Sequence, residues 1–267
     1  MSREAEVTGS TLVTALCRGV VDYAGTFPPA ELGLDDAVEN YARYRRSADR
    51  WMLHRFVVSA GDLDTFAPNP VDPPWPVSVA CRGPEDVARA RAWQREAAVV
   101  ASVEVRSTSP INAPGCEVFV ECPLPIEPAE LEELKARGAM LKIRLGGVSI
   151  PPSAAVARTL FACAAIDLPF KATAGLHHAI RSESHGFLNL LLATTLAGDG
   201  GDPDELEALL DETDAAAFTV VDAHITWRRC RFDAHAIAAA RRLFRSFGSC
   251  SFEEPVDSIH ALELPAR

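Results

Sequence analysis

The chain has 267 residues, of which 48% are hydrophobic and 24% charged, a balance typical of a soluble globular protein with a sizeable core. Lysine and arginine total 26 against 37 aspartates and glutamates, so the net charge of −11 argues against nucleic acid or an anionic membrane as a partner. No apolar run reaches the roughly 18 residues of a membrane span, and the polar N-terminus is no signal peptide, so we expect a cytoplasmic protein.

Short apolar segments alternate with amphipathic segments along the chain. The predicted strands are, in order, 19–25, 54–60, 76–82, 99–106, 117–122, 140–147, 169–173 and 246–252. The predicted helices are 34–46, 83–96, 128–138, 153–165, 185–198, 233–246 and 254–262. Eight strands, most of them followed by a helix, indicate an α/β protein with a parallel sheet, and a (β/α)8 TIM barrel typically takes about 250 residues.

The region before the last helix and strand departs from this alternation. An acidic helical segment and a predicted hairpin at 217–232 form an insertion at about residues 199–232, within a single domain of residues 1–267. The alternative architecture is an open doubly wound sheet. No glycine-rich dinucleotide loop follows the first strand, so the closed barrel is favoured.

Charged residues occupy the strand positions that face the barrel interior. Because every second residue of a strand points the same way, the outward apolar residues leave charged residues inside, seven of them towards the carboxyl ends of the strands. They are Asp22, Glu104, Arg106, Glu121, Lys142, Arg144 and Lys171. These charges gather at the carboxyl ends of strands, where TIM-barrel active sites lie. Buried charges are costly, so the group indicates either an active site or a structural layer of ion pairs.

Two lysines form the sharpest feature of this group. Lys142 and Lys171 lie on successive predicted strands, and neighbouring strands are about 4.8 Å apart. Repulsion between two ammonium groups and partial burial both lower a lysine pKa. A partly neutral amine can attack a carbonyl group and form a Schiff base, with Glu104 or Glu121 moving protons.

Four segments resemble the class I, Schiff-base aldolases of the deoxyribose-phosphate aldolase type. They are VVDYAGTFPPAEL in the first strand region, LKIRLGG in the sixth, FKATAGLHH in the seventh and FGSCSF in the eighth. The resemblance implies a TIM-barrel lyase that needs no cofactor. By position it matches Lys142 to the Schiff-base lysine, Lys171 to the neighbour that lowers its pKa, and Glu104 to a catalytic aspartate. The matching first strand bears Asp22.

The expected substrate is a small carbonyl compound with a phosphate or carboxylate group. Backbone N–H groups in the loops after strands seven and eight often bind phosphate in such barrels, and an arginine adds a bidentate contact. The candidate substrate-binding residues are Arg144, Thr173, Gly175, His177, His178, Gly248 and Ser249. The alternative role for the glycines is to form tight turns only.

Two other functions stay open. His177, His178 and His185 lie in one short segment and suggest a metal-dependent hydrolase or isomerase with Glu121. The third reading is a non-catalytic barrel whose interior charges form structural ion pairs. The sequence leaves open the substrate, the direction of reaction and the oligomeric state, a homo-oligomer included.

Overall fold

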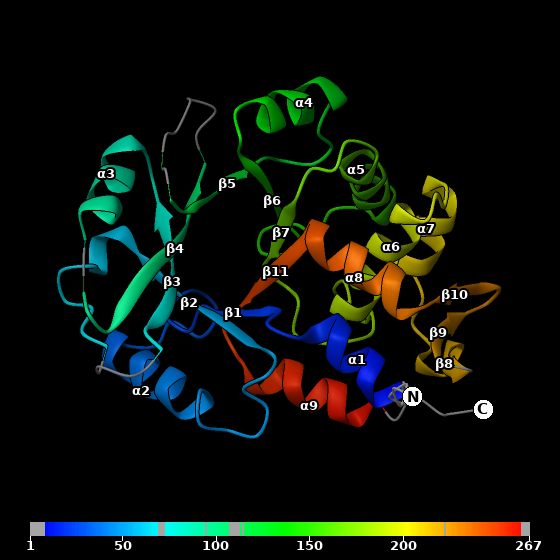
Figure 1. Cartoon of the computed structure of the whole chain (residues 1–267), viewed down its shortest axis with the longest axis horizontal. Coiled ribbons are helices and arrows are strands. Elements are labelled where there is room, and N and C mark those ends of the chain that lie inside the picture. The colour runs from blue at the N-terminus through cyan, green and yellow to red at the C-terminus, as the bar shows by residue number, and fades with distance from the viewer. Residues whose placement is uncertain are drawn as a thin grey trace, which may run out of the picture.

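A closed barrel of eight parallel strands forms the centre of the computed structural model, which describes residues 9–68, 73–93, 95–106, 113, 115–221 and 223–262. The strand order around the barrel is β1-β11-β7-β6-β5-β4-β3-β2 (Figure 1). The strands are β1 (Val21–Tyr23), β2 (Leu53–Ser59), β3 (Trp75–Cys81), β4 (Ala98–Val105), β5 (Glu117–Glu121), β6 (Met140–Arg144), β7 (Phe170–Thr173) and β11 (Phe244–Ser249). The predicted TIM barrel is therefore confirmed.

Helices surround the barrel. They are α1 (Gly9–Cys17), α2 (Leu34–Tyr44), α3 (Pro84–Ala92), α4 (Pro128–Ala136), α5 (Ser153–Ala165), α6 (Phe187–Gly198), α8 (Ala234–Leu243) and α9 (Glu253–Ala261). A 3-10 turn, Ala60–Asp62, is the helical element in the described part of the β2–β3 connection, and the described part of the β4–β5 connection contains no helix. The alternation of strand and helix is thus incomplete in that half of the barrel.

Local signals set several helix boundaries. Helix α4 begins at Pro128, whose fixed φ suits a first helical position. The side chains of Glu127 and Glu130 form a reciprocal capping box at this end. The helix ends just before Gly138, which adopts a φ of +69° that favours glycine. These residues explain why the predicted and observed bounds of α4 agree closely.

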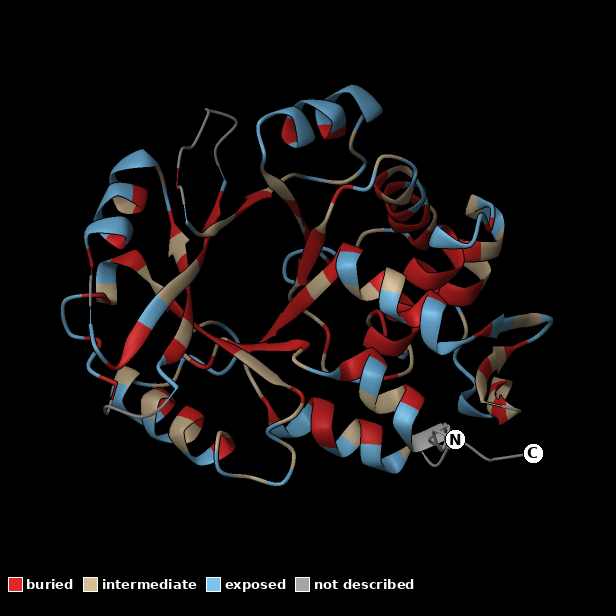
Figure 2. Cartoon of the chain, in the orientation of Figure 1, coloured by how far each residue is buried: buried red, intermediate tan, exposed pale blue. Residues whose placement is uncertain are grey.

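Burial follows the barrel strands and the inner faces of the helices (Figure 2). Val103, Ile143 and Ala172 are fully buried between the strands and the helical layer, as the alternation predicts. Strand register places Lys142 directly beside Lys171 on β7 and beside Glu121 on β5. The two lysines therefore lie at the same height in the barrel, as expected from their positions in the strands.

The predicted insertion of a helix and a hairpin is confirmed, and it contains one further strand. It consists of α7 (Pro203–Leu210) and an antiparallel sheet of β8 (Phe218–Val221), β9 (His224–Trp227) and β10 (Cys230–Phe232), in the order β10-β9-β8. Helix α7 contacts α5 and α6, while β9 contacts α1 and β10 contacts α6. The insertion therefore packs on the helical layer at the side of the barrel, at the right of Figure 1. Within the described residues, no helix has the length and apolar character needed to cross a bilayer.

Candidate active site

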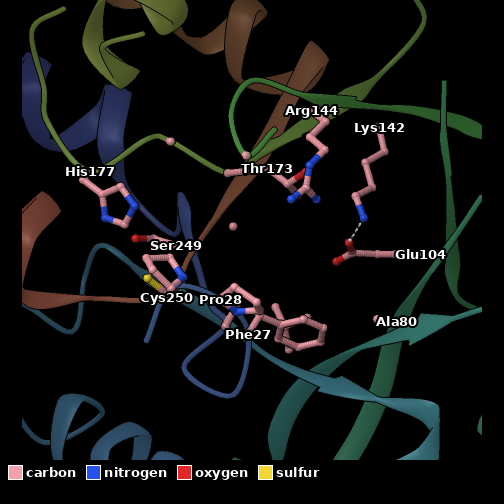
Figure 3. A pocket seen from close by; sticks show the side chains of 17 residues that line it. Phe27, Pro28, Ala80, Glu104, Lys142, Arg144, Thr173, His177, Ser249 and Cys250 are labelled. Carbon is pink, nitrogen blue, oxygen red and sulfur yellow. Dashed lines mark ion pairs between the residues drawn. The ribbon is translucent and has the colours of Figure 1, made fainter. Parts of the chain in front are cut away.

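A cavity of about 440 Å³ opens at the carboxyl ends of the barrel strands, the end at which TIM-barrel active sites lie. Figure 3 shows Lys142 and Glu104 on one side of this cavity and His177, Ser249 and Cys250 on the opposite side. Eight of the predicted site residues line it: Glu104, Lys142, Arg144, Thr173, Gly175, His177, Gly248 and Ser249. The structure thus brings most of the predicted site together in one space.

Five side chains of alternating charge run from the barrel centre to this cavity. We call them the ion-pair chain: Asp22, Lys171, Glu104, Lys142 and Glu121. Lys171 Nζ lies 2.5 Å from Asp22 Oδ2 and 2.6 Å from Glu104 Oε1. Lys142 Nζ lies 2.9 Å from both Glu104 Oε2 and Glu121 Oε2. Glu104 therefore bridges the two ammonium groups.

Hydrogen bonds fix the buried carboxylates of the chain. Ser246 Oγ donates to Asp22 Oδ2 over 2.7 Å, and Ser78 Oγ donates to Glu104 Oε1 over 2.7 Å. His54 Nδ1 lies 2.9 Å from Asp22 Oδ1. These three partners were not among the residues predicted from the sequence. Ser78 could have been noticed from the sequence, because it is a polar residue inside the otherwise apolar strand β3.

Exposure separates the two lysines. The side chain of Lys171 is 0% exposed, and its Nζ lies 5.4 Å from the centre of the Phe119 ring. The Lys142 side chain is 12% exposed and lines the cavity. Asp22 is likewise fully buried and does not line the cavity. Lys142 is therefore the barrel amine that a bound molecule can reach.

The expectation of a lowered pKa at Lys142 is wrong. Burial does lower the pKa of Lys142, but the adjacent Glu104 and Glu121 carboxylates outweigh burial and raise it above its ordinary value of 10.5. The prediction assumed that two lysines at one height would face each other directly. Glu104 reaches between them from β4 instead, so attraction to carboxylates replaces repulsion between ammonium groups.

The predicted position of Arg106 inside the barrel is also wrong. Its side chain is 69% exposed, because it follows the last residue of β4 and turns outward. Arg106 Nε still contacts the ion-pair chain from outside the barrel, because it lies 2.9 Å from Glu121 Oε1. Glu121 is therefore held between two cations, Lys142 and Arg106.

The two carboxylates that flank Lys171 have lowered pKa values. Burial alone would raise the pKa of Glu104, but Lys171 and Lys142 outweigh burial and lower it to about 2. Burial opposes a similar effect at Asp22, where Lys171 and His54 hold the pKa well below its ordinary value of 3.8. Both carboxylates are therefore charged in the folded protein at neutral pH.

These shifts predict a loss of stability in acid. Because the folded pKa of Glu104 is about 2 against an ordinary 4.5, its contribution to stability is complete above pH 4.5 and is lost as the pH falls towards 2. Asp22 acts in the same direction. We expect the free energy of unfolding to fall by about 1.4 kcal/mol per pH unit for each group in this range. Urea unfolding at a series of pH values measures this change in the free energy of unfolding. In Glu104→Gln the free energy should fall less steeply with pH than in the parent protein. An equal slope in the two proteins would contradict a lowered pKa at Glu104.

Lysine is rare in this protein. Only three of the 26 basic residues are lysines, and two of them, Lys142 and Lys171, lie in the barrel interior. The third, Lys135, is exposed on α4. Arginine pairs with carboxylates at least as well as lysine, but it does not lose its proton at accessible pH. Lys142 therefore places at the cavity a cation that can lose its proton, which an arginine at the same position could not do.

Arg144 places a guanidinium group at the cavity. It lines the cavity, and among the described residues no carboxylate forms an ion pair with it. Arg144 Nε donates to the Gly146 carbonyl oxygen over 3.1 Å, which folds the guanidinium over its own loop. A Cβ at Gly147, whose φ is +101°, would lie 2.9 Å from Arg144 Nη2. Glycine at this position therefore makes room for the arginine.

The glycines near the cavity allow backbone conformations and close approaches that a side chain would disturb. Gly175 has a φ of +75°, which favours glycine, and a Cβ at Gly146 would lie 3.0 Å from Gly175 Cα. A Cβ at Gly248 would lie 3.3 Å from Thr173 Cγ2. The loops after β6 and β7 thus meet closely at the edge of the cavity, and the ends of β7 and β11 pack tightly beside them.

The histidine segment does not assemble as one site. His177 Nδ1 lies 2.6 Å from Glu254 Oε2 at the cavity wall, whereas His178 is exposed in an adjoining hollow. His185 is buried, with Nε2 2.9 Å from the Pro151 carbonyl oxygen and burial lowering its pKa. Across the described ranges, no group of three or more histidine, cysteine or acidic residues is arranged to hold a metal ion.

Comparison with known proteins adds no family to this description. No protein-family model matches the chain, and no curated protein matches it. The fold and the site alone therefore define the class: a TIM barrel with a buried ion-pair chain that ends at an accessible lysine. A TIM barrel is commonly the scaffold of an enzyme.

Proposed function

We propose that the protein is a lyase of aldolase type, in which Lys142 forms a Schiff base with a small anionic carbonyl compound. One observation carries the proposal: Lys142 reaches the cavity between two carboxylates, and its Nζ lies 2.9 Å from each. An amine with proton acceptors at hydrogen-bond distance, at the carboxyl end of a TIM barrel, has the parts that imine formation needs.

Lys142 must lose a proton before it can react. The raised pKa keeps it as an ammonium group in the resting protein, so only a small neutral fraction attacks the carbonyl carbon. Glu104 becomes a better base at this moment, because one of the two cations that lower its pKa has lost its charge. Glu104 also lines the cavity, so it is positioned to move protons between Lys142 and the substrate.

The reaction then follows imine chemistry. The neutral Nζ adds to the carbonyl carbon, water leaves, and a protonated imine remains. Glu104 removes the proton of the β-hydroxyl group, the carbon–carbon bond breaks, and its electron pair moves into the imine to form an enamine. Protonation of the enamine carbon and hydrolysis release the second product and restore Lys142. In the opposite direction the same steps form the bond.

The surrounding residues bind the substrate in this proposal. Arg144 holds the phosphate or carboxylate group, since its charge has no described carboxylate partner. His177 faces the cavity with Nδ1 on Glu254, and therefore contacts the opposite end of the substrate. Lys171 is a positioning residue: it holds Glu104 and Asp22 in place without reaching the cavity.

The pairing of the buried charges also supports a second candidate, a barrel without catalysis. Lys171 contacts both Asp22 and Glu104 at hydrogen-bond distance, so the charges in this part of the ion-pair chain are paired without a ligand. In that case the ion-pair chain only closes the barrel interior, and Lys142 forms no adduct with carbonyl compounds.

Borohydride trapping distinguishes the two functions. The full chain is incubated with a panel of small aldehydes and ketones that carry phosphate or carboxylate groups, reduced with borohydride and digested for peptide mass spectrometry. We expect a reduced adduct on Lys142, none on Lys171, and no trapping at this peptide in Lys142→Met. Exposed Lys135 serves as an internal control for nonspecific reaction. Absence of an adduct on Lys142 across the panel, or labelling of Lys135 alone, would reject the lyase.

A further inference from the structure

A second cavity of about 1020 Å³ lies at the opposite end of the barrel. Its wall includes Gly19 before β1, Leu53 at the start of β2 and Pro76 near the start of β3. The segment between α2 and β2 completes the wall. These are the amino ends of the strands, so this cavity is separate from the candidate active site at their carboxyl ends.

Arginine dominates the charge of this cavity. Four arginines line it: Arg18, Arg45, Arg46 and Arg50. No aspartate or glutamate is among the lining residues, and none of the carboxylates in the described part of the chain forms an ion pair with any of the four. The whole protein has a net charge of −11, so a concave group of four uncompensated arginines is a local reversal of its charge.

One of these arginines has an unmet hydrogen-bonding demand. Arg45 Nη2 donates to the Pro73 carbonyl oxygen over 2.8 Å, which fixes the guanidinium in the wall. Arg45 Nη1 is buried and has no hydrogen-bond partner. A buried donor without a partner is costly, and the wall around Arg45 lacks a nearby acceptor for Nη1.

Aromatic side chains complete the wall. Trp51 is partly buried beside the arginines, and Tyr41 is held by a 2.6 Å hydrogen bond from its hydroxyl group to the His54 carbonyl oxygen. An indole next to guanidinium groups can contact a ring of a ligand while the arginines bind its charged groups. The wall therefore combines several fixed cations with apolar surface.

We propose that this cavity binds a small organic polyanion with more than one phosphate group, of the nucleoside polyphosphate class. Four arginines exceed what one phosphate group needs, and the concave shape suits a molecule of limited size. A nucleic acid or an anionic membrane would extend beyond the cavity and be repelled by the negative charge of the surrounding protein. The proposal does not depend on the lyase chemistry at the other end of the barrel.

The cavity comes within one side chain of the ion-pair chain. His54 lines it, and His54 Nδ1 lies 2.9 Å from Asp22 Oδ1. One side chain therefore separates a bound anion from the buried carboxylate that holds Lys171.

Calorimetric titration of the full chain tests the site, with adenosine triphosphate, tripolyphosphate and inorganic phosphate as probes. We expect saturable binding of both polyphosphates, tighter for the nucleotide because of its ring, and binding weaker by about tenfold or more for inorganic phosphate. Arg46→Gln/Arg50→Gln should weaken polyphosphate binding by about tenfold or more. The matched control Arg158→Gln/Arg242→Gln removes two exposed arginines outside the cavity and should change binding by less than about twofold.

Three results would overturn the proposal. The first is no saturable polyphosphate binding below about 1 mM. The second is an equal loss in the two double variants, which would indicate general attraction to positive charge. The third is tighter binding of a single-stranded RNA oligonucleotide that depends on Arg46 and Arg50, since the occupant would then be a nucleic acid.

Discussion

Lys171→Met should lower the free energy of unfolding by about 3–5 kcal/mol. Lys171 is 0% exposed and contacts two carboxylates that are also buried, Asp22 at 2.5 Å and Glu104 at 2.6 Å. Methionine has a similar length and can pack against the Phe119 ring, so the change removes charge with little loss of volume. The cost arises because two buried negative charges lose their shared cation.

Urea unfolding at neutral pH measures this loss, and two variants define its cause. Lys135→Met removes an exposed lysine and should change stability by less than about 1 kcal/mol. Lys171→Met combined with Glu104→Gln removes one of the uncompensated charges and should recover part of the loss. A Lys171→Met protein within about 1 kcal/mol of the parent would show that the ion-pair chain contributes little to stability.

The strand pattern predicted which residues meet in the barrel. Parallel strands and a side-chain period of two place Glu104, Lys142 and Lys171 on the inner surface from local sequence alone. The register then follows from barrel closure, and it confirms that the two lysines are direct neighbours. Alternation is a local property, so it can be read without knowing the tertiary structure.

Which charges contact each other was not predictable in the same way. Glu104 reaches Lys171 and Lys142 across the barrel interior from a strand that pairs with neither β6 nor β7. Side-chain length and barrel curvature decide this contact, and neither appears in a strand pattern. The pKa of Lys142 depends on that single contact and on Glu121, so its predicted direction was wrong.

The histidine segment shows the same limit. Proximity in sequence suggested a shared metal site, but the turn before α6 places His185 against Pro151 while His177 contacts Glu254 of α9. A loop has no fixed period, so the directions of its side chains could not be inferred. Similarly, the basic cavity combines Arg18 with arginines of the separate segment between α2 and β2, and no motif links the two.

The rate of borohydride trapping at Lys142 should rise about tenfold for each pH unit, and thus about a hundredfold from pH 7 to pH 9. The Lys142 pKa lies above its ordinary value of 10.5, so the amine is protonated across this whole range and its neutral fraction grows with hydroxide concentration. Timed incubation with an aldehyde at each pH, followed by a common reduction step, measures the rate.

Substitution of Glu121 tests the physical cause of this profile. Glu121 Oε2 lies 2.9 Å from Lys142 Nζ and raises the pKa of that amine, so Glu121→Gln should move the profile to lower pH and increase trapping at pH 7. Glu132→Gln, at an exposed position of α4, is the matched control and should leave the profile in place. A flat rate between pH 7 and pH 9 in the parent protein would mean that the amine is already neutral, and that its carboxylate neighbours do not hold its proton.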